Sequence, residues 1–263
     1  MGLLKKITKW IRRAKKAREQ RRRLDVEWTL PSGLTVQVED QGEWLIYNDI
    51  FVDGEYDLPL QKALKSIISK DIVTIVDVGA NVGFFALKAA DWFFRNCNTD
   101  HDFRIVCIEG SPHVFEKLQG RVLRETLLAG RITLIHGLVG QRAGKGKIVE
   151  KPFHAMNRVD ALAKSKEKWV LVPYVDLPLA LAHIPAIDLL KCDIEGSELE
   201  LLESSPELFS KVRFAVFELH DYNCDTQKCR RILNELGFVH CQTIRAVPNS
   251  FSLEFYSRSV EPQ

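Results

Sequence analysis

An acid and two glycines follow a short apolar, β-branched run in this 263-residue sequence. Their order is Asp77-x-Gly79-x-x-x-Gly83, with Ala80 and Asn81 between the two glycines. A dinucleotide-binding turn needs the spacing G-x-G-x-x-G, so this stretch does not indicate a pyrophosphate ligand. Glycines let a ligand approach the main chain, and the start of a following helix offers free N–H groups. With its acid, the turn suits a ligand that carries a positive group, and a plain tight turn is the alternative.

A second acid, Glu109, ends the next apolar run and lies 26 residues after Gly83. An acid at the end of the second strand of a βαβ unit is placed to accept hydrogen bonds from ribose hydroxyls. Gly110 and Ser111 follow it, and Pro112 suits the first turn of a helix. Glu109 is therefore a candidate for binding a nucleoside.

Four more candidates for chemistry stand at the ends of two later apolar runs, namely Asp193, Glu195, Glu218 and His220. Carboxylates and imidazole are common general bases, so these residues could deprotonate or position a nucleophile. We favour Asp193 or His220 as the base, with Glu195 and Glu218 in positioning roles. In a second interpretation, Asp193 and Glu195 hold a divalent cation such as Mg²⁺, but two carboxylates alone make a thin site and we predict no metal. Glu195 also suits the start of a helix, where an acid interacts favourably with the helix dipole.

The elements that must position these residues alternate between strand and helix. Apolar, β-branched runs separated by segments of helical spacing predict a parallel sheet with helices on both faces. We expect an α/β fold with a doubly wound, Rossmann-like sheet of seven strands, the last two forming an antiparallel hairpin. The predicted strands are residues 72–78, 103–108, 132–135, 187–193, 212–219, 238–244 and 251–256. The predicted helices are 84–96, 112–128, a helix that follows Glu198 and ends at about Phe209, and 224–236.

Residues 25–70 form a predicted N-terminal cap laid against the main domain, residues 71–263. Pro31, Ser32 and Gly33 indicate a turn between strands, residues 44–52 resemble a further strand, and residues 58–70 have the pattern of an amphipathic helix. Glu55 and Tyr56 precede the first sheet strand closely enough to reach its ligand.

A polar insertion, residues 141–172, lies near the predicted carboxyl ends of the strands, where a substrate-facing lid is common. It contains two strand-like pieces, 147–150 and 169–172. His154, Asn157 and Arg158 lie on it and could contact substrate, although a polar surface loop is the simpler interpretation.

The charge of the chain is unevenly distributed. Residues 1–23 hold eleven basic residues and one acid, so they carry +10, whereas the rest of the chain carries −8. Leu3, Leu4, Ile7 and Trp10 share one helical stripe, which predicts that residues 1–24 form a cationic amphipathic helix on an anionic membrane surface. A solvated tail and a nucleic-acid-binding arm are the alternatives.

Other features of the sequence bear on the cellular location. No apolar run is long enough to span a membrane, and the basic start is not followed by the apolar region of a secretory signal. The six cysteines are scattered and lack paired zinc spacing, so we expect them to be reduced. We predict a cytoplasmic protein, with peripheral attachment to the inner face of a membrane as an added possibility.

Three segments resemble the FkbM family of methyltransferases: VDVGANVGFFALKAA (76–90), IEGSPHVFEKL (108–118) and IDLLKCDIEGSELELLE (187–203). The resemblance covers residues 54–220, and Cys192 stands where Ile or Val is more usual. It implies a class I methyltransferase fold and S-adenosylmethionine (SAM) as cofactor. By the same resemblance, Asp77, Gly79, Asn81 and Gly83 line the methionine half of SAM, Glu109 holds the ribose, Gly110 and Ser111 border the adenine, and Asp193 lies beside the methyl group.

Members of this family methylate hydroxyl groups on sugars or polyketide-like products, so the expected substrate is a small molecule or a glycan. We predict O-methylation of a glycan, a lipid-linked sugar or a secondary metabolite. The alternative is a non-catalytic, membrane-attached module with the same fold. Nucleic acid is not an expected partner, because Asp193-Ile194-Glu195-Gly196 stands where an amino-methylating enzyme would have an Asn/Asp-Pro-Pro-aromatic motif, and no Pro-Cys pair is present at Cys192.

Overall fold

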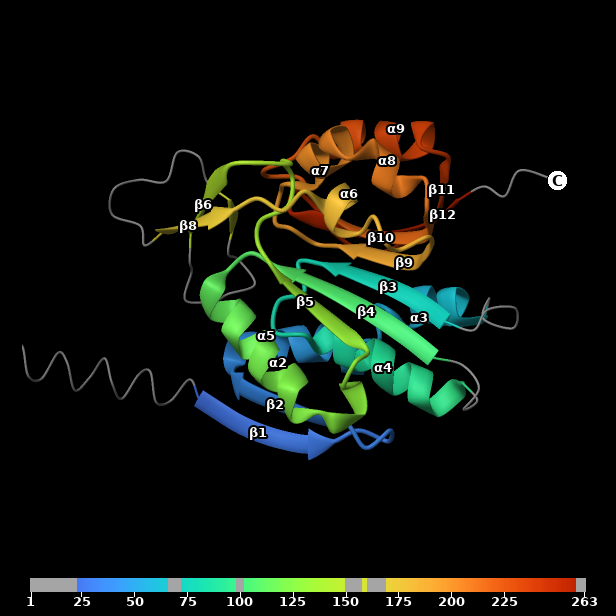
Figure 1. Cartoon of the computed structure of the whole chain (residues 1–263). Helices are drawn as coiled ribbons and strands as arrows, with labels where there is room; N and C mark the ends of the chain where they lie inside the picture. The colour runs from blue at the N-terminus through green and yellow to red at the C-terminus, as the bar shows by residue number, and fades with distance from the viewer. Residues whose placement is uncertain (1–22, 66–71, 98–101, 150–157, 160–168, 259–263) are drawn as a thin grey trace, which may run out of the picture.

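The computed structural model describes residues 23–65, 72–97, 102–149, 158–159 and 169–258 (Figure 1). The predicted cationic helix of residues 1–24 therefore lies almost entirely outside the described residues, as do His154 and Asn157 of the insertion.

A seven-stranded sheet crosses the middle of the molecule in the order β11-β12-β10-β9-β3-β4-β5 (Figure 1). Only β12 runs antiparallel to its neighbours, β10 and β11, and the other pairings are parallel. The doubly wound sheet with an antiparallel terminal hairpin is thus confirmed. Its strands are β3 (Ile72–Val78), β4 (Asp102–Glu109), β5 (Ile132–His136), β9 (Ile187–Cys192), β10 (Val212–His220), β11 (Phe238–Val247) and β12 (Phe251–Arg258).

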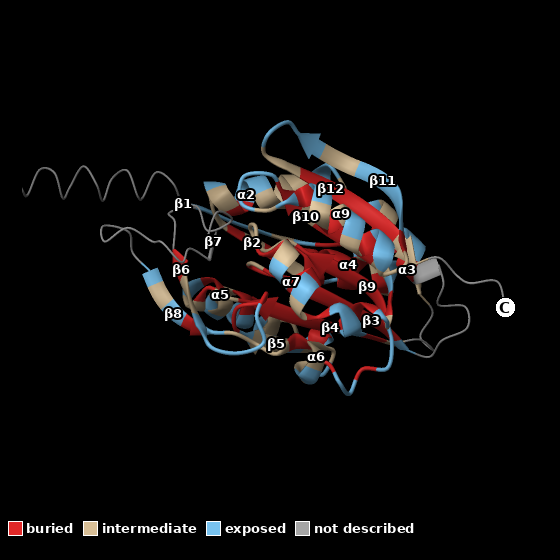
Figure 2. Ribbon diagram, turned by 90° about the horizontal axis from the view of Figure 1, so that it is seen from above, coloured by how far each residue is buried: buried red, intermediate tan, exposed pale blue. Residues whose placement is uncertain are grey.

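Successive residues of the central strands point to opposite faces, which creates a separate apolar core on each side of the sheet. In β3, Ile75 joins one core and Val76 the other, and Leu189 and Leu190 of β9 divide in the same way. Figure 2 shows these central strands buried, while the edge strand β11 is largely exposed. A strand covered on both faces must be apolar almost throughout, which is why the sequence pattern revealed it.

Helices cover both faces of the sheet (Figure 1). α3 (Asp57–Lys65), α4 (Phe84–Asn96) and α5 (Pro112–Arg124) pack into one core, and a 3₁₀ turn (Thr126–Leu128) follows α5. The other core takes α6 (Leu177–Ala180), α7 (Glu198–Ser204), α8 (Pro206–Phe209) and α9 (Thr226–Glu235). The single helix predicted to follow Glu198 and end at about Phe209 is two helices, because Pro206 lacks the N–H that would continue α7.

The N-terminal cap consists of a hairpin and a helical stretch: β1 (Arg23–Thr29), β2 (Thr35–Asp40), α2 (Gln41–Tyr47) and the π-helical η1 (Asn48–Val52). The strand predicted over 44–52 is wrong. Asp40 accepts hydrogen bonds from the backbone N–H groups of Gly42 and Glu43, and this cap starts a helix. Trp44 and Tyr47 then stack on one helical face, as residues at positions i and i+3 of a helix do. The apolar residues of this segment are compatible with a strand as well, so the sequence pattern alone did not identify the helix.

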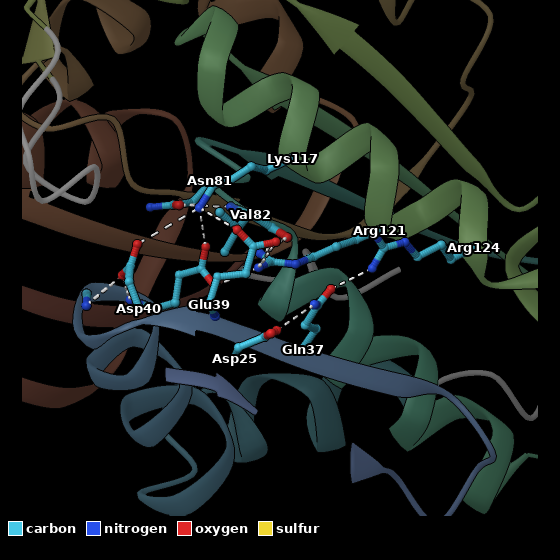
Figure 3. A network of polar contacts seen from close by, with 11 residues as sticks. Asp25, Gln37, Glu39, Asp40, Asn81, Val82, Lys117, Arg121 and Arg124 are labelled. Carbon is cyan, nitrogen blue, oxygen red and sulfur yellow. Dashed lines mark hydrogen bonds and ion pairs between the residues drawn. The ribbon is translucent and has the colours of Figure 1, made fainter. Parts of the chain in front are cut away.

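Charged side chains join the cap to α5 (Figure 3). Glu43 is fully buried, and its carboxylate meets Lys117 Nζ at 2.7 Å and Arg121 Nη2 at 2.6 Å. Arg121 also donates through Nη1 to the carbonyl of Val82 at 3.2 Å. The cap, α5 and the turn after β3 are therefore held together by one network.

The predicted insertion forms a small antiparallel sheet of β6 (Lys145–Val149), β7 (Arg158–Val159) and β8 (Trp169–Pro173). Leu138, Ile148 and Val172 form its own apolar cluster. In the described part of the chain, no helix is both long enough and apolar enough to cross a membrane. The six cysteines are free, as expected.

Candidate functional site

A cavity of about 380 Å³ opens at the carboxyl ends of the parallel strands. It lies where the chain order reverses, since β4 and β5 follow β3 in one direction and β9 and β10 extend the sheet in the other. Ligands of open α/β sheets bind at such a switch point, and small-molecule sites measure roughly 300–1,000 Å³. The cavity is therefore the candidate site.

The turn after β3, residues 79–83, forms one wall and is called the glycine loop below. Gly79 has φ +79°, and a Cβ atom added there would stand 1.8 Å from the carbonyl oxygen of Asp193. Asn81 also adopts a left-handed conformation, with φ 50°, and its side chain accepts a hydrogen bond from the N–H of Val82. Such backbone strain is common at functional sites. The close approach at Gly79 explains why the first glycine is needed.

Glu109 lines the cavity at the end of β4, and backbone N–H groups orient its carboxylate. Asn81 donates to Oε2 at 2.9 Å and Ser111 to Oε1 at 2.7 Å. Burial raises the pKa of this carboxyl group, although the two N–H donors act in the opposite direction. Because a carboxylate has about four acceptor positions, each oxygen can still accept a further hydrogen bond. This arrangement fits the ribose hydroxyls of SAM.

An apolar wall stands beside Gly110, which also lines the cavity. It consists of Leu138, Val139 and Ile148. A Cβ atom on Gly110 would lie 2.7 Å from Leu138 Cδ2, so the absence of a side chain allows this wall to close. This apolar wall next to Glu109 suits the adenine ring.

Asp77 does not line the cavity. It is fully buried beneath the cavity floor, 3.2 Å from Lys191 Nζ, and burial raises its pKa although Lys191 opposes that shift. Burial would lower the pKa of Lys191, but Asp77 and Asp193 raise it, so the ammonium stays charged. Lys191 itself lines the cavity, and it donates to the carbonyl of Gly79 at 2.7 Å. Asp77 thus acts on the cavity through Lys191.

The other predicted cofactor-binding residues fall into two groups, those that line the cavity and those that, like Asp77, act from behind it. Gly79, Ala80, Asn81, Glu109, Gly110 and Glu55 line the cavity, whereas Gly83 and Ser111 do not. Gly83 starts α4 with φ 89°, and Ser111 contributes its backbone N–H to Glu109 while its side chain is buried.

The four predicted catalytic residues converge on the opposite wall, and we call them the carboxylate–histidine cluster. His220 Nε2 lies 3.4 Å from Glu218 Oε1, 3.6 Å from Glu195 Oε2 and 4.0 Å from Asp193 Oδ1. All four line the cavity. The carboxyl ends of β9 and β10 bring these residues together, although Asp193 and His220 lie 27 positions apart in the sequence.

Glu198 holds the imidazole from behind. This side chain is fully buried, and its Oε1 accepts from His220 Nδ1 at 2.9 Å and from the N–H of Gly196 at 3.0 Å. Glu198 therefore orients both the loop after β9 and the His220 ring. It does so from the first position of α7.

The charges of the cluster depend on one another. Burial alone would lower the pKa of His220, but the hydrogen bond to Glu198 and the surrounding carboxylates raise it to about 11. Burial and the charge of Asp193 raise the pKa of Glu195 to about 8 and that of Glu218 to about 7. As long as no other cation occupies the cluster, His220 therefore carries a proton, and the carboxylates rather than the imidazole are the proton acceptors.

At the cavity, ion pairs of Arg245 join the cap to the C-terminal hairpin of β11 and β12. Arg245 of β11 meets Glu55 Oε1 at 2.6 Å and Asp49 Oδ1 at 3.0 Å. Burial raises the pKa of Glu55, although Arg245 counteracts this. Glu55 thus reaches the cavity as predicted, with Arg245 as its partner.

Four cavity or supporting residues were missed in the sequence: Lys191, Glu198, Tyr222 and Arg245. Lys191 is the only lysine in the predicted strand 187–193, and a basic residue in a buried strand could have indicated a buried acid as its partner. Tyr222 donates to Glu195 Oε2 at 2.6 Å, and neither it nor Arg245 lies in a motif that would reveal this.

Comparison with known proteins gives one family match. The model of the methyltransferase FkbM domain matches residues 77–239. Among curated proteins, none matches this chain.

Solved structures with similar folds include a methyltransferase FkbM from Methylobacillus flagellatus KT, at 20% identity and a TM-score of 0.46. That match covers 71% of this chain and 44% of the other, so this chain spans less than half of that protein. Another is magnesium protoporphyrin IX methyltransferase from Synechocystis PCC 6803 with bound SAM, at 14% identity and a TM-score of 0.46, covering 81% of this chain and 84% of the other.

Proposed function

Since the chain belongs to the FkbM family of methyltransferases, we propose that it transfers a methyl group from SAM to a hydroxyl group of a glycan, a lipid-linked sugar or a secondary metabolite. The family membership confirms the resemblance found in the sequence. One observation carries the proposal for the acceptor: a single cavity holds both the nucleoside-binding features around Glu109 and the carboxylate–histidine cluster.

The glycine-loop side of the cavity suits the methyl donor. Glu109 would accept hydrogen bonds from the ribose hydroxyls, the apolar wall beside Gly110 would contact the adenine, and Gly79, Ala80 and Asn81 would border the methionine part. SAM supplies a methyl group on a sulfonium, so the protein needs only to align an acceptor with it and exclude water.

The cluster side suits a hydroxyl acceptor. An alcohol is a weak nucleophile until its proton is removed, so a base within hydrogen-bond reach accelerates the transfer. We assign the base to a carboxylate of the cluster, with Asp193 as the first choice and Glu218 as the second. As the oxygen–carbon bond forms and the sulfur–carbon bond breaks, the hydroxyl proton passes to that carboxylate.

The charge of the cavity limits the class of acceptor. Asp49, Glu55, Asp193, Glu195 and Glu218 all line it, and these five acids outnumber its three basic side chains, Lys191, His220 and Arg245. A phosphate or carboxylate close to these side chains would be repelled. This supports a neutral, hydroxylated acceptor and argues against a nucleic-acid substrate.

Tyr222 and Phe251, which also line the cavity, offer aromatic faces for the apolar side of a sugar ring.

We propose further that residues 1–23 attach the protein to an anionic membrane surface, where a lipid-linked acceptor would be found. Leu45 of α2 supports this, because it lines the cavity and yet is 56% exposed. The chain without residues 1–23 should lose binding to anionic vesicles and keep its SAM affinity. Equal vesicle binding by the two forms would contradict this attachment.

The test of the main proposal is to incubate membrane and soluble extracts with labelled SAM and the protein, beside the Asp193→Asn variant as a matched control. We expect label in a glycan or lipid fraction with the parent protein and little with the variant. Label found only in RNA or protein would overturn the assigned acceptor. If calorimetry detects no binding of SAM, the chain is a non-catalytic module.

A further inference from the structure

We propose that Asp193, Glu195 and His220 bind a divalent metal ion of the first transition row beside the acceptor hydroxyl. The catalytic consequence rests on the proposed methyl transfer, but the binding of the ion does not. This site extends the pair of carboxylates considered from the sequence, since His220 lies 25 residues after Glu195 and joins them only in the folded chain.

The spacing of the three side chains is that of a ligand set. One donor atom from each residue lies within 4.8 Å of the others. His220 Nε2 is 3.6 Å from Glu195 Oε2 and 4.0 Å from Asp193 Oδ1. Ligands bound to one octahedral ion at about 2.1 Å stand roughly 3–4 Å apart, so an ion requires only small movements of these groups.

The second observation is the state of His220 Nε2. The side chain is only 3% exposed, and its ring points this nitrogen into the cluster. Its nearest carboxylate oxygen, Glu218 Oε1, is 3.4 Å away, longer than an ordinary N–H···O hydrogen bond of about 2.7–3.2 Å. Among the described residues, Nε2 therefore faces three carboxylates at 3.4–4.0 Å, and its contact with Glu218 is a long one. This spacing is expected where a cation shared by the three carboxylates lies between them.

The residues behind the ligands are arranged for metal binding. Glu198 takes His220 Nδ1 at 2.9 Å, and a carboxylate on the far ring nitrogen is the usual support of a metal-binding histidine. Tyr222 donates to Glu195 Oε2 at 2.6 Å and orients that carboxylate, and the same oxygen keeps a further lone pair for the ion.

Lys191 does not compete for the same oxygen of Asp193. Its Nζ lies 3.7 Å from Asp193 Oδ2, whereas Oδ1 is the oxygen that faces His220. The ammonium is also held by Asp77 at 3.2 Å, so it balances the buried acid and leaves Oδ1 available.

The ligand set indicates the class of ion. Two carboxylates and one imidazole suit Mn²⁺ or Fe²⁺ better than Ca²⁺, which prefers oxygen ligands only. Three protein ligands leave positions open for the acceptor hydroxyl and water. There the ion would polarise the hydroxyl. With Asp193 engaged as a ligand, Glu218, the second candidate base, would take the proton as the methyl group moves from sulfur to oxygen.

The test uses the full chain after chelator treatment, with Mn²⁺ as the probe. Calorimetry and electron paramagnetic resonance should detect one Mn²⁺ per chain, with a nitrogen coupling from His220. Glu195→Gln and His220→Gln should each weaken binding at least about tenfold, and His220→Gln should abolish the nitrogen coupling. Glu203→Gln is the matched control, since Glu203 is an exposed acid of α7 paired with Lys228, and it should leave Mn²⁺ binding unchanged.

Absence of Mn²⁺ binding by the parent chain would overturn the proposal, and would mean that the imidazole proton and Lys191 alone balance the carboxylates of the cluster. Binding that survives Glu195→Gln unchanged would also overturn it, as an adventitious ion only. Glu195 is partly exposed, so that variant remains informative if His220→Gln fails to fold. SAM titration of the same samples separates the two proposals: SAM binding without Mn²⁺ binding leaves the methyltransferase standing, and absence of SAM binding refutes it whatever the metal result.

Discussion

The two walls of the cavity are built by different means. On the side of β3 and β4, the groups that face the ligand are set by the backbone: the glycine loop turns through left-handed conformations, and two N–H groups orient Glu109. On the side of β9 and β10, side chains from separate strand ends converge on His220. A wall of backbone is specified by a few neighbouring residues, whereas a wall of side chains depends on how distant segments pack.

The walls meet at two points, Gly79 and Lys191. Gly79 lets the loop after β3 pass against the carbonyl of Asp193, and Lys191 lies between the buried Asp77 and Asp193. A change at either point should therefore damage both walls, and changes farther out should affect one wall only.

The largest effect is expected from Gly79→Ala. A Cβ atom would overlap the Asp193 carbonyl at 1.8 Å and would also strain a φ of +79°, so we expect a loss of about 5 kcal/mol or more in the free energy of unfolding. Denaturant unfolding measures it. Gly130→Ala is the matched control, because Gly130 has φ +75° but no described atom within 4 Å of the added Cβ. It should cost only about 1–2 kcal/mol, and equal losses in both variants would refute the close contact.

Lys191→Met should come next. It leaves Asp77 buried without its cation, which typically costs about 3–5 kcal/mol in the free energy of unfolding. The double variant with Asp77→Asn removes the stranded charge, so it should be more stable than Lys191→Met alone. If the two substitutions destabilise additively, Lys191 and Asp77 are not coupled across the junction.

Much of the fold was predictable from the sequence because its central strands are buried on both faces. Residues 72–78 and 187–193 are mainly apolar for that reason, with a few buried polar side chains such as Asp77 and Lys191. The antiparallel hairpin was predictable from the turn residues 248–250, and Asn249 there has φ 58°. The error at residues 44–52 has a local cause. Trp44, Tyr47 and Phe51 suit either a strand or a helix, and the capping by Asp40 decided the outcome.

The candidate site was predictable to the extent that it is built locally. Glu109 lies on the cavity because a parallel strand must end at the ligand edge of the sheet. Asp77 precedes the end of its strand by one residue, so its side chain points into the protein and meets Lys191. The pairing of His220 with Glu198 depends on the register of β9 and β10, which no local pattern in the sequence records.

Glu109→Gln should separate the two walls. The amide loses the charge that favours hydrogen bonds from hydroxyls, and its NH₂ group must face one of the two backbone N–H donors. We expect the Kd for SAM to rise about 10–100-fold, equivalent to about 1.5–3 kcal/mol.

Calorimetric titration with SAM measures this effect. Glu116→Gln, an exposed acid on α5, should leave the Kd unchanged. Glu195→Gln on the opposite wall should reduce turnover with little change in SAM affinity. An equal loss of SAM affinity in Glu195→Gln and Glu109→Gln would show that the walls do not act separately.

The smallest effect concerns pH and belongs to the backbone-built wall. Burial raises the pKa of Glu109, so this group takes up a proton at a higher pH than an ordinary glutamate at about 4.3. The ionised carboxylate of Glu109 is the form that can accept hydrogen bonds from both ribose hydroxyls of SAM. SAM affinity should therefore be full above the raised pKa and should fall as the pH drops through it, by at most about tenfold per pH unit. Calorimetry over a pH series measures the fall, and Glu109→Gln should show a flat profile because it has no proton to gain. A parent profile as flat as that of the variant would mean that SAM does not depend on the charge of Glu109, and that the N–H groups of the loop, rather than the carboxylate they orient, hold the nucleoside.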